Sequence, residues 1–310
     1  MKAKFINETH IEGWIYEHKL EKKVTGPASK NPGTEFISGT ISIATDNAMT
    51  NIVPVHYTYI TATTSSGNSD SRFTALSNVI DGTWKNVMEH GKDVATKVKI
   101  DSAIGVNDFY TERNGEETLV TAKRNESGFI HAENNLKENE NERGTFTCDM
   151  VITATIRTEA DPENNRPERM TLRGCTFDFR KAILPIELTV LNPVAMDYFE
   201  SLDISSHNPV FTKIWGRQVS TVSTVTKTEE SAFGEAKVTE VQNTRKDWVV
   251  TGAAADPYVW DDESTITAAE LNTAMAERES HLADVHTRWK EYQDNKKAPS
   301  AATTSTGFNF

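Results

Sequence analysis

The sequence predicts a mainly β protein that contains two copies of one small domain. Residues 39–60 and 171–191 each hold two apolar runs of strand length around a turn-forming segment, which is the pattern of a β-hairpin. The decamers NIVPVHYTYI and AILPIELTVL, which close the two stretches, agree in apolar pattern, and Gly174 stands in the second stretch where Gly39 stands in the first. Spaced matches in the same order indicate a duplicated domain.

In the first copy, three strands precede a helix and two strands follow it. The expected strands are residues 10–24, the two arms of the hairpin at 39–60, residues 95–104 and residues 118–122, the last with a resumption at 129–131. Between residues 73 and 88, apolar side chains recur at the spacing of a helix. This helix is expected to end at Gly91, which suits the left-handed position after a helix.

The second copy repeats this order. Its expected strands are residues 146–158, 169–179, 182–191, 211–225 and 238–250. Asn192 as N-cap and Pro193 at the first helical position begin its short helix. Both copies therefore read β-β-β-α-β-β. Five strands with a helix between the third and fourth form an OB fold, a small, partly open Greek-key barrel, so the sequence predicts two tandem OB-fold-like β-barrels.

Beyond residue 252 the chain becomes acidic. Thr267 and Glu270 form a capping box that begins an acidic C-terminal helix, which is expected to end near residue 293. A narrow apolar stripe along this helix is formed by Leu271, Met275, Leu282 and Val285. Residues 133–143 are expected to be a solvated linker or a long turn. The expected divisions are a first OB-fold-like domain at 1–135, a second at 136–252, an acidic linker and helix at 253–295, and a disordered tail at 296–310.

Composition indicates a soluble, rather polar protein, with 37% hydrophobic residues and a mean hydropathy of -0.53. No apolar run approaches the roughly 20 residues of a membrane span, and the N-terminus has no signal-peptide pattern, so we expect a cytoplasmic protein. Cys148 and Cys175 are expected to be buried free thiols. Much of the net charge of -12 comes from residues 256–294, which leaves a body that can carry a basic face.

The motifs of common enzyme classes are absent from the sequence. It has no Gly-rich loop that ends in Gly-Lys-Ser/Thr, no Gly-x-Ser-x-Gly elbow and no His-Glu-x-x-His zinc site. The eight histidines are scattered singly. Asp261 and Asp262 have no further carboxylate cluster, so a solvated turn explains them better than a cation site. We therefore expect no catalysis, no cofactor and no metal.

OB barrels commonly bind ligands on the face of their second and third strands and through their loops. Nucleic-acid single strands need aromatic rings for the bases and Lys or Arg for the phosphates. The candidates are Trp14, Tyr16, Lys22, Lys23, Tyr57, Tyr59, Phe109, Tyr110, Lys123 and Arg124 in the first copy, and Phe177, Phe179, Arg180, Lys181, Trp215 and Arg217 in the second. Alternation predicts that Tyr57 and Tyr59 share one face of their strand. The competing interpretation is that at least half of these aromatic residues fill the barrel cores.

The C-terminal region suggests two further roles. Phe308 and Phe310, near the end of a flexible tail, are candidate contacts for partner proteins. The acidic segment is a candidate occupant of a basic groove, from which nucleic acid would displace it. The alternative is that the helix packs on a barrel and the tail only improves solubility.

The segments GWIY, GTEFISGTISIATD, NIVPVHYTY and KVKIDSAIGVNDFY of the first copy, with RMTLRGCTFDF and NPVFTKIWGRQVS of the second, resemble single-stranded DNA-binding proteins of tailed bacteriophages that have tandem OB folds. The resemblance covers roughly residues 10–252. It implies barrels that coat single strands in the host cytoplasm, and an acidic C-terminal tail ending in phenylalanine that recruits replication proteins. The terminal STGFNF of this chain contains no acidic residue and departs from that pattern.

Three functions therefore fit the sequence. The first is a non-catalytic, largely sequence-independent single-stranded DNA-binding protein of phage DNA replication or recombination, which uses base stacking and phosphate contacts. The second is a virion structural or assembly protein built of two β domains. The third is an OB module for RNA or oligosaccharide, because a fold does not determine its ligand.

Overall fold

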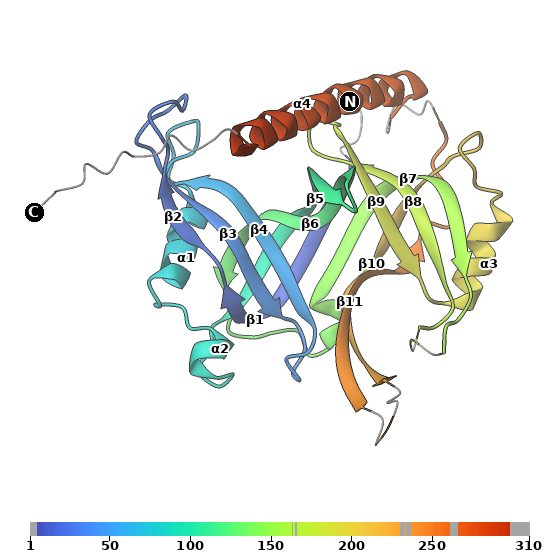
Figure 1. The fold of residues 1–310 in the computed structure, drawn as a ribbon, viewed down its shortest axis with the longest axis horizontal. Helices are drawn as coiled ribbons and strands as arrows, with labels where there is room; N and C mark the ends of the chain where they lie inside the picture. Colours follow the sequence, from blue (N-terminus) through green and yellow to red (C-terminus); the bar gives the residue numbers. More distant parts are fainter. Residues whose placement is uncertain are drawn as a thin grey trace, which may run out of the picture.

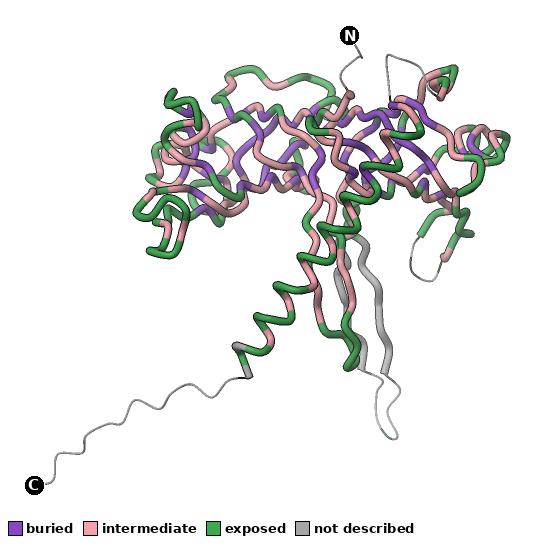
Figure 2. The backbone as a smooth tube through the Cα atoms, turned by 90° about the horizontal axis from the view of Figure 1, so that it is seen from above, coloured by how far each residue is buried: buried purple, intermediate pink, exposed green. Residues whose placement is uncertain are grey.

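Two β-barrels lie side by side (Figure 1), and a long C-terminal helix begins beside the second barrel and extends away from the body that they form (Figure 2). The structure is a computed structural model of the 310-residue chain. It describes residues 5–162, 164, 166–229, 233, 237–260 and 266–297. Across these residues the strands join into one 11-stranded sheet that closes on itself within each barrel, which confirms the predicted mainly β class.

The first barrel has the strand order of an OB fold. Its elements are β1 (Asn7–His18), β2 (Glu21–Val24), β3 (Glu35–Ala44), β4 (Ile52–Thr61), α1 (Ser71–Ile80), α2 (Val87–His90), β5 (Lys97–Arg113) and β6 (Glu116–Ala132). Strand β1 pairs antiparallel with β3 and β5, β3 pairs with β4, and β5 pairs with β6. A short parallel pairing of β4 with β6 closes the barrel.

The predicted single helix between residues 73 and 88 is wrong, because the structure has two helices there. Asp70 caps α1 by accepting a hydrogen bond from the backbone N–H of Arg72. Gly82 then has a φ of 72°, a left-handed conformation that ends a helix. Asn86 starts α2 by accepting from the N–H of Glu89 at 2.9 Å. Trp84, between the two helices, packs against the barrel core.

The second barrel has the same topology. Its elements are β7 (Gly144–Thr158), β8 (Arg169–Phe177), β9 (Ile183–Val190), α3 (Pro193–Ser201), β10 (Val210–Glu229) and β11 (Lys237–Ala253), preceded by the 3₁₀ turn η1 (Glu140–Glu142). Strands β9 and β11 pair in parallel, as β4 and β6 do. Asn192 caps α3 and Pro193 occupies its first turn, as predicted. Cys148 and Cys175 are free thiols on β7 and β8.

Gly39 and Gly174, which mark the repeat, each allow two strands of their barrel to approach closely. A Cβ atom on Gly39 would lie 2.0 Å from the carbonyl oxygen of Lys19, and one on Gly174 would lie 1.9 Å from that of Val151. In each barrel the second strand therefore passes the first too closely for any side chain at this position. This close approach explains why the duplicated sequence has glycine at both places.

The barrels are joined by backbone pairing and not only by a linker. Strand β1 pairs antiparallel with β7, from Asn7 opposite Cys148 to Ile11 opposite Gly144. The expectation of a solvated linker at 133–143 is wrong for its last residue. Arg143 is buried, and its guanidinium donates to the carbonyl of Lys137 and to the side chain of Asn47. The linker is packed here because it leads directly into β7.

The β5–β6 hairpin is much longer than predicted. It has ladder pairing from Val98 opposite Ala132 to Arg113 opposite Glu116, and Asn114 and Gly115, with φ values of 52° and 81°, make the turn. Asn-Gly is the strongest short signal for such a turn. Figure 2 shows this hairpin and the C-terminal helix leaving one side of the flat body formed by the barrels.

The C-terminal helix α4 (Ala268–Lys297) has the predicted capping box. The backbone N–H of Glu270 donates to the hydroxyl of Thr267, and the N–H of Thr267 donates to the carboxylate of Glu270. Ile266, just before the helix, and Ala274 are buried against the second barrel. Of the apolar stripe, Leu271 packs against this buried cluster, whereas Met275 is 51% exposed.

Four residues that the sequence analysis singled out lie outside the described residues: Asp261, Asp262, Phe308 and Phe310. The helix ends at Lys297 and not near residue 293. Among the helices that the structure describes, none is long and apolar enough to cross a bilayer.

Candidate nucleic-acid interface

The outward faces of the second and third strands are the common ligand faces of OB barrels. In the first barrel β1 and β2 together correspond to the first strand of the fold, so its second and third strands are β3 and β4. Alternation along β4 buries Val53 and Val55 and turns Pro54 and His56 outward. His56 Nδ1 lies 3.0 Å from the hydroxyl of Thr40 on β3. Burial, with the nearby guanidinium of Arg124, lowers the pKa of His56, so His56 is a neutral hydrogen-bonding group at pH 7.

In the second barrel the corresponding strands are β8 and β9. Met170 and Leu172 are buried, while the side chains between and beside them face outward. These outward side chains are Arg169, Thr171 and Arg173 on β8, with Thr189 on β9. The face is therefore a row of guanidinium groups and hydroxyls, which are donors suited to phosphate oxygens.

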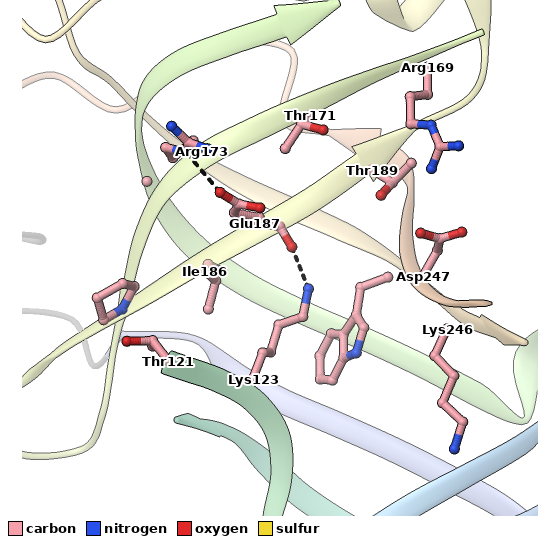
Figure 3. Close-up of a pocket in the computed structure, with 13 residues that line it drawn as sticks. Thr121, Lys123, Arg169, Thr171, Arg173, Ile186, Glu187, Thr189, Lys246 and Asp247 are labelled. Atoms are coloured by element: carbon pink, nitrogen blue, oxygen red, sulfur yellow. Dashed lines mark hydrogen bonds and ion pairs between the residues drawn. The ribbon is translucent and has the colours of Figure 1, made fainter. Parts of the chain in front are cut away.

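Each barrel also sends its last two strands across the face of the other. Lys123 on β6 donates to the carbonyl of Glu187 on β9, as Figure 3 shows. In the opposite direction, Gln218 on β10 exchanges side-chain hydrogen bonds of 2.8 and 2.9 Å with Asn125 on β6. Both amides are at most 5% exposed. Each of the two amides donates one hydrogen bond to the other and accepts one from it. The pair therefore fixes how the two barrel faces sit against each other.

Two adjoining cavities of about 520 and 160 Å³ lie along these faces. The larger is lined from β6, β8, β9 and β11 (Figure 3) and the smaller from β4, β6, β10 and β11. They share Lys123, Lys246, Asp247 and Trp248. We call the two together the central channel, because these shared residues lie where the ligand faces of the two barrels meet.

Lys123 and Trp248 form the middle of the central channel. The Lys123 ammonium lies 4.9 Å from the centroid of the Trp248 ring, within the range of a cation–π contact. The ring is 8% exposed and packs 5.2 Å from Phe146 on its barrel side. Burial lowers the pKa of Lys123 to about 8, so its charge is only partly compensated by its surroundings.

The cations of the channel fall into two groups. Arg173 pairs with Glu187 at 2.8 Å, and Arg124 pairs with Glu126 at 2.8 Å. Arg169 and Lys246, in contrast, make no ion pair with any residue that the structure describes. Burial, followed by the neighbouring guanidinium of Arg245, lowers the pKa of Arg169. The central channel can therefore accept an anion.

The family model of YorF matches residues 6–288 of the sequence, which include both barrels and most of α4. The chain belongs to the YorF family. Among solved structures it is similar to the wild-type single-stranded DNA binding protein from Thermus aquaticus, with a TM-score of 0.43 and 9% identity over 84% of this chain and 97% of that chain. A deletion mutant of that protein gives 0.42 and 7% over the same shares. Similarity at this level does not determine a ligand, and no curated protein matches the sequence.

Few of the side chains predicted from the sequence of this YorF-family chain come together. Lys123 and Arg124 line the central channel. Arg217 lies at a third cavity, which adjoins the central channel through Gln218, Val219 and Ser220, and it donates there to the side chain of Asn141. Among the described residues there is also no cluster of His, Cys, Asp and Glu that could hold a metal ion.

Three predicted aromatic residues are core residues instead of stacking platforms. Phe177 is fully buried, and Tyr57 is 2% exposed with its hydroxyl donating to the carbonyl of Gly128. Trp14 is 7% exposed, and the cations of Lys92, Arg143 and Lys97 lie 4.8, 5.7 and 5.9 Å from its ring. None of the three can stack on a base in this fold. For these three residues, packing in the barrel core is the interpretation that the structure supports.

Tyr57 and Tyr59 do not share a face, which corrects the prediction from alternation. The pairing of β3 with β4 shifts register between Ile37 and Gly39, and the shift reverses the alternation beyond Tyr57. Tyr59 is consequently 47% exposed and packs against Phe36, with ring centroids 4.7 Å apart. A bulge of this kind redirects side chains without any mark in the hydrophobic pattern.

The remaining candidates are spread over the surface. Phe179 is 78% exposed beneath Arg180, and Trp215 is 39% exposed over Gly252. The others lie on β1, on β2 or beside α4: Tyr16 is half-buried, Lys22 and Lys23 pair with Asp81 and Glu21, Lys181 pairs with Glu270, and Phe109 and Tyr110 line a groove beside α4. They form no single patch with the channel.

Sequence reasoning missed the polar outward face of β8. Arg169, Thr171 and Arg173 alternate with the buried Met170 and Leu172 in the segment RMTLRG. Polar residues at every second position of a strand share its outward face. That period-2 signal was available in the sequence, but a search for aromatic residues beside cations does not detect it.

Proposed function

We propose that the central channel binds single-stranded DNA, without catalysis and largely without sequence preference. The observation that carries the proposal is that the ligand faces of two OB barrels open onto one channel whose cations Arg169 and Lys246 have no carboxylate partner in the part of the chain that the structure describes. Phosphates supply the missing anions. The hydroxyls of Thr171 and Thr189 add donors that read no particular base.

A single strand suits this channel better than a duplex. Beside the cations lie half-buried apolar side chains, Ile52, Pro54 and Val219. A single strand can place its bases against such surfaces and its phosphates on the cations. A duplex offers only its phosphates, because its bases are stacked and paired inside. We therefore expect single strands to bind more tightly than duplex DNA.

The proposal includes a setting and partners. The phage proteins that the sequence resembles act in DNA replication and recombination, and we place the proposed activity there. Phe308 and Phe310, outside the described residues, remain our candidate contacts for replication proteins.

The test is the anisotropy of a fluorescent oligo-dT, titrated with the full chain at two salt concentrations with duplex DNA as competitor. We expect binding that salt weakens by a slope of about -0.7 per neutralised phosphate and that duplex does not displace. Arg169→Ala and Lys246→Ala should each reduce the steepness of that slope by about 0.7. Lys99→Ala is the matched control, since Lys99 pairs with Asp101 outside the channel. Absence of binding by folded protein at low salt would refute the proposal.

A further inference from the structure

A second groove lies between α4 and the β5–β6 hairpin. It has a volume of about 540 Å³ and is lined by residues 106–110 of β5 and by residues from His281 to Tyr292 of α4. We call it the α4 groove. It shares no lining residue with the central channel.

The groove has a rigid floor. The Arg278 guanidinium makes two hydrogen bonds of 2.6 Å to the carboxylate of Asp108, whose side chain is 3% exposed. Just over two turns further along the helix, His286 stacks on Tyr110 at 4.5 Å and its Nε2 lies 2.9 Å from a carboxylate oxygen of Glu117. These contacts fix α4 along one face of the hairpin, so the groove does not depend on a ligand to form.

Three aromatic side chains of the groove are only partly covered. Phe109 is 40% exposed and Tyr292 is 60% exposed. Trp289 also lines the groove and is half-buried, and its indole N–H is covered without a hydrogen-bond partner among the described residues. A buried donor without an acceptor is costly. A ligand acceptor toward which the indole turns would therefore gain a hydrogen bond that the protein does not make.

The geometry of the rings and the local charge narrow the choice of ligand. The rings of Trp289 and Tyr292 are 6.4 Å apart and 31° from parallel, near twice the rise of about 3.4 Å between stacked bases. Arg288 and His281 also line the groove, and Arg288 makes no ion pair with a described carboxylate. A flat aromatic ring with hydrogen-bond acceptors and a nearby anion fits these features, which is the chemistry of a nucleotide in a single strand.

A path leads to this groove from the central channel. Gly105, Asn107 and Phe109 on β5 pair with Arg124, Ala122 and Val120 on β6, and cross-strand partners share one face of a hairpin. On this face Asn107 and Phe109 are exposed. The opposite face, with Asp108 and Tyr110, meets α4. A strand that leaves the channel at Arg124 can therefore cross the open face of the hairpin and reach Phe109.

We propose that the α4 groove is a second base-binding site, which receives a base of a DNA strand that extends beyond the central channel. This inference rests on the proposed function of the channel. It assigns α4 a direct part in binding through Trp289 and Tyr292. It also predicts that the occluded length of DNA exceeds the length that the barrel faces cover.

The experiment is an anisotropy titration of the full chain with a series of oligo-dT probes from about 8 to about 40 nucleotides, which spans the site sizes of one and two OB folds. Tyr292→Ala removes one ring and keeps a residue with high helix propensity. Trp289→Phe keeps a ring and removes the N–H donor. Met275→Ala is the control, because Met275 is 51% exposed on the same helix and does not line the groove.

We expect Tyr292→Ala to weaken binding of the long probes about 5- to 150-fold, the value of one lost stacking contact, with no change for the shortest probe. Trp289→Phe should weaken the long probes about 2- to 12-fold. Native affinity of both variants at every length, with the native protein binding all probes, overturns the inference and leaves the channel proposal standing. Equal losses in Met275→Ala also overturn it. Failure of the native protein to bind any probe removes both proposals.

Discussion

Raising the pH should weaken DNA binding by the native protein far more than binding by Lys123→Arg. Lys123 lies in the central channel, where its ammonium donates to the carbonyl of Glu187 and faces the ring of Trp248. Burial lowers the pKa of Lys123 to about 8, so the free protein loses this charge just above neutral pH. An arginine at the same position keeps its charge over this range.

Proton linkage sets the size of the effect. A phosphate beside the ammonium favours the charged form and raises the pKa of Lys123. If the contact restores the ordinary value of 10.5, affinity falls about 25-fold between about pH 7 and about pH 9.5. Folding responds with the opposite sign. The pKa is lowered in the folded state, so the unfolded chain binds more protons between about pH 8 and about pH 10.5, and the free energy of unfolding rises with pH there. Loss of binding in this window is therefore not a result of unfolding.

The assay is fluorescence anisotropy with labelled oligo-dT at constant ionic strength and several pH values, with circular dichroism to verify folding at each. The ratio of native to Lys123→Arg affinity isolates Lys123, because the two proteins share every other titrating group and the same probe. A ratio that stays constant from about pH 7 to about pH 9.5 would refute the reasoning, because the ammonium would then gain no proton on binding.

Three further predictions concern stability, each measured by urea denaturation. Arg278→Ala should lower the free energy of unfolding by about 3–5 kcal/mol, because the carboxylate of Asp108 stays buried and keeps only Thr121 and His281 as partners; a loss below about 1 kcal/mol would show a solvated pair. Gly174→Ala should cost about 1–3 kcal/mol through the clash with β7, whereas Gly26→Ala, with no atom within 4 Å, should cost little. Asn125→Ala should cost about 1–3 kcal/mol by leaving Gln218 unsatisfied, and a double-mutant cycle with Gln218→Ala that gives no coupling would contradict the amide pair.

Local signals predicted much of the fold. The cap formed by Asn192 and Pro193 and the capping box of Thr267 and Glu270 depend on residues within one turn, and both are present. The strand order was predicted from the turn-forming residues that separate the apolar runs. The length of the β5–β6 hairpin could not be predicted from apolar alternation, since one face of its outer half meets α4 through polar contacts such as Arg278 with Asp108 and the other face is open. Only the Asn-Gly turn at Asn114 marked how far the hairpin extends.

The binding face was predicted poorly for a physical reason. In a small barrel the largest apolar side chains go to the core, so a search for aromatic residues selects residues such as Tyr57 and Phe177, which are buried. The channel instead consists of small and charged side chains that alternate with core residues. Its centre, Lys123 beside Trp248, joins strands of two different barrels. No signal within one copy of the repeat reports a contact that duplication and β1–β7 pairing create.

The charge pattern of α4 argues against the idea that the acidic segment masks the channel. The helix meets the first barrel through Arg278, which pairs with Asp108, and through His286, which lies against Glu117, while acidic residues such as Asp284 are exposed. An anionic competitor of DNA would instead be held by the cations of the channel. The net charge of -12 therefore acts on DNA as a repulsive background that salt screens within about 10 Å, while attraction inside the channel is set by its own unpaired cations. Lowering the salt concentration should consequently strengthen both the repulsion and the attraction. The measured salt dependence of binding then reports the difference between the two.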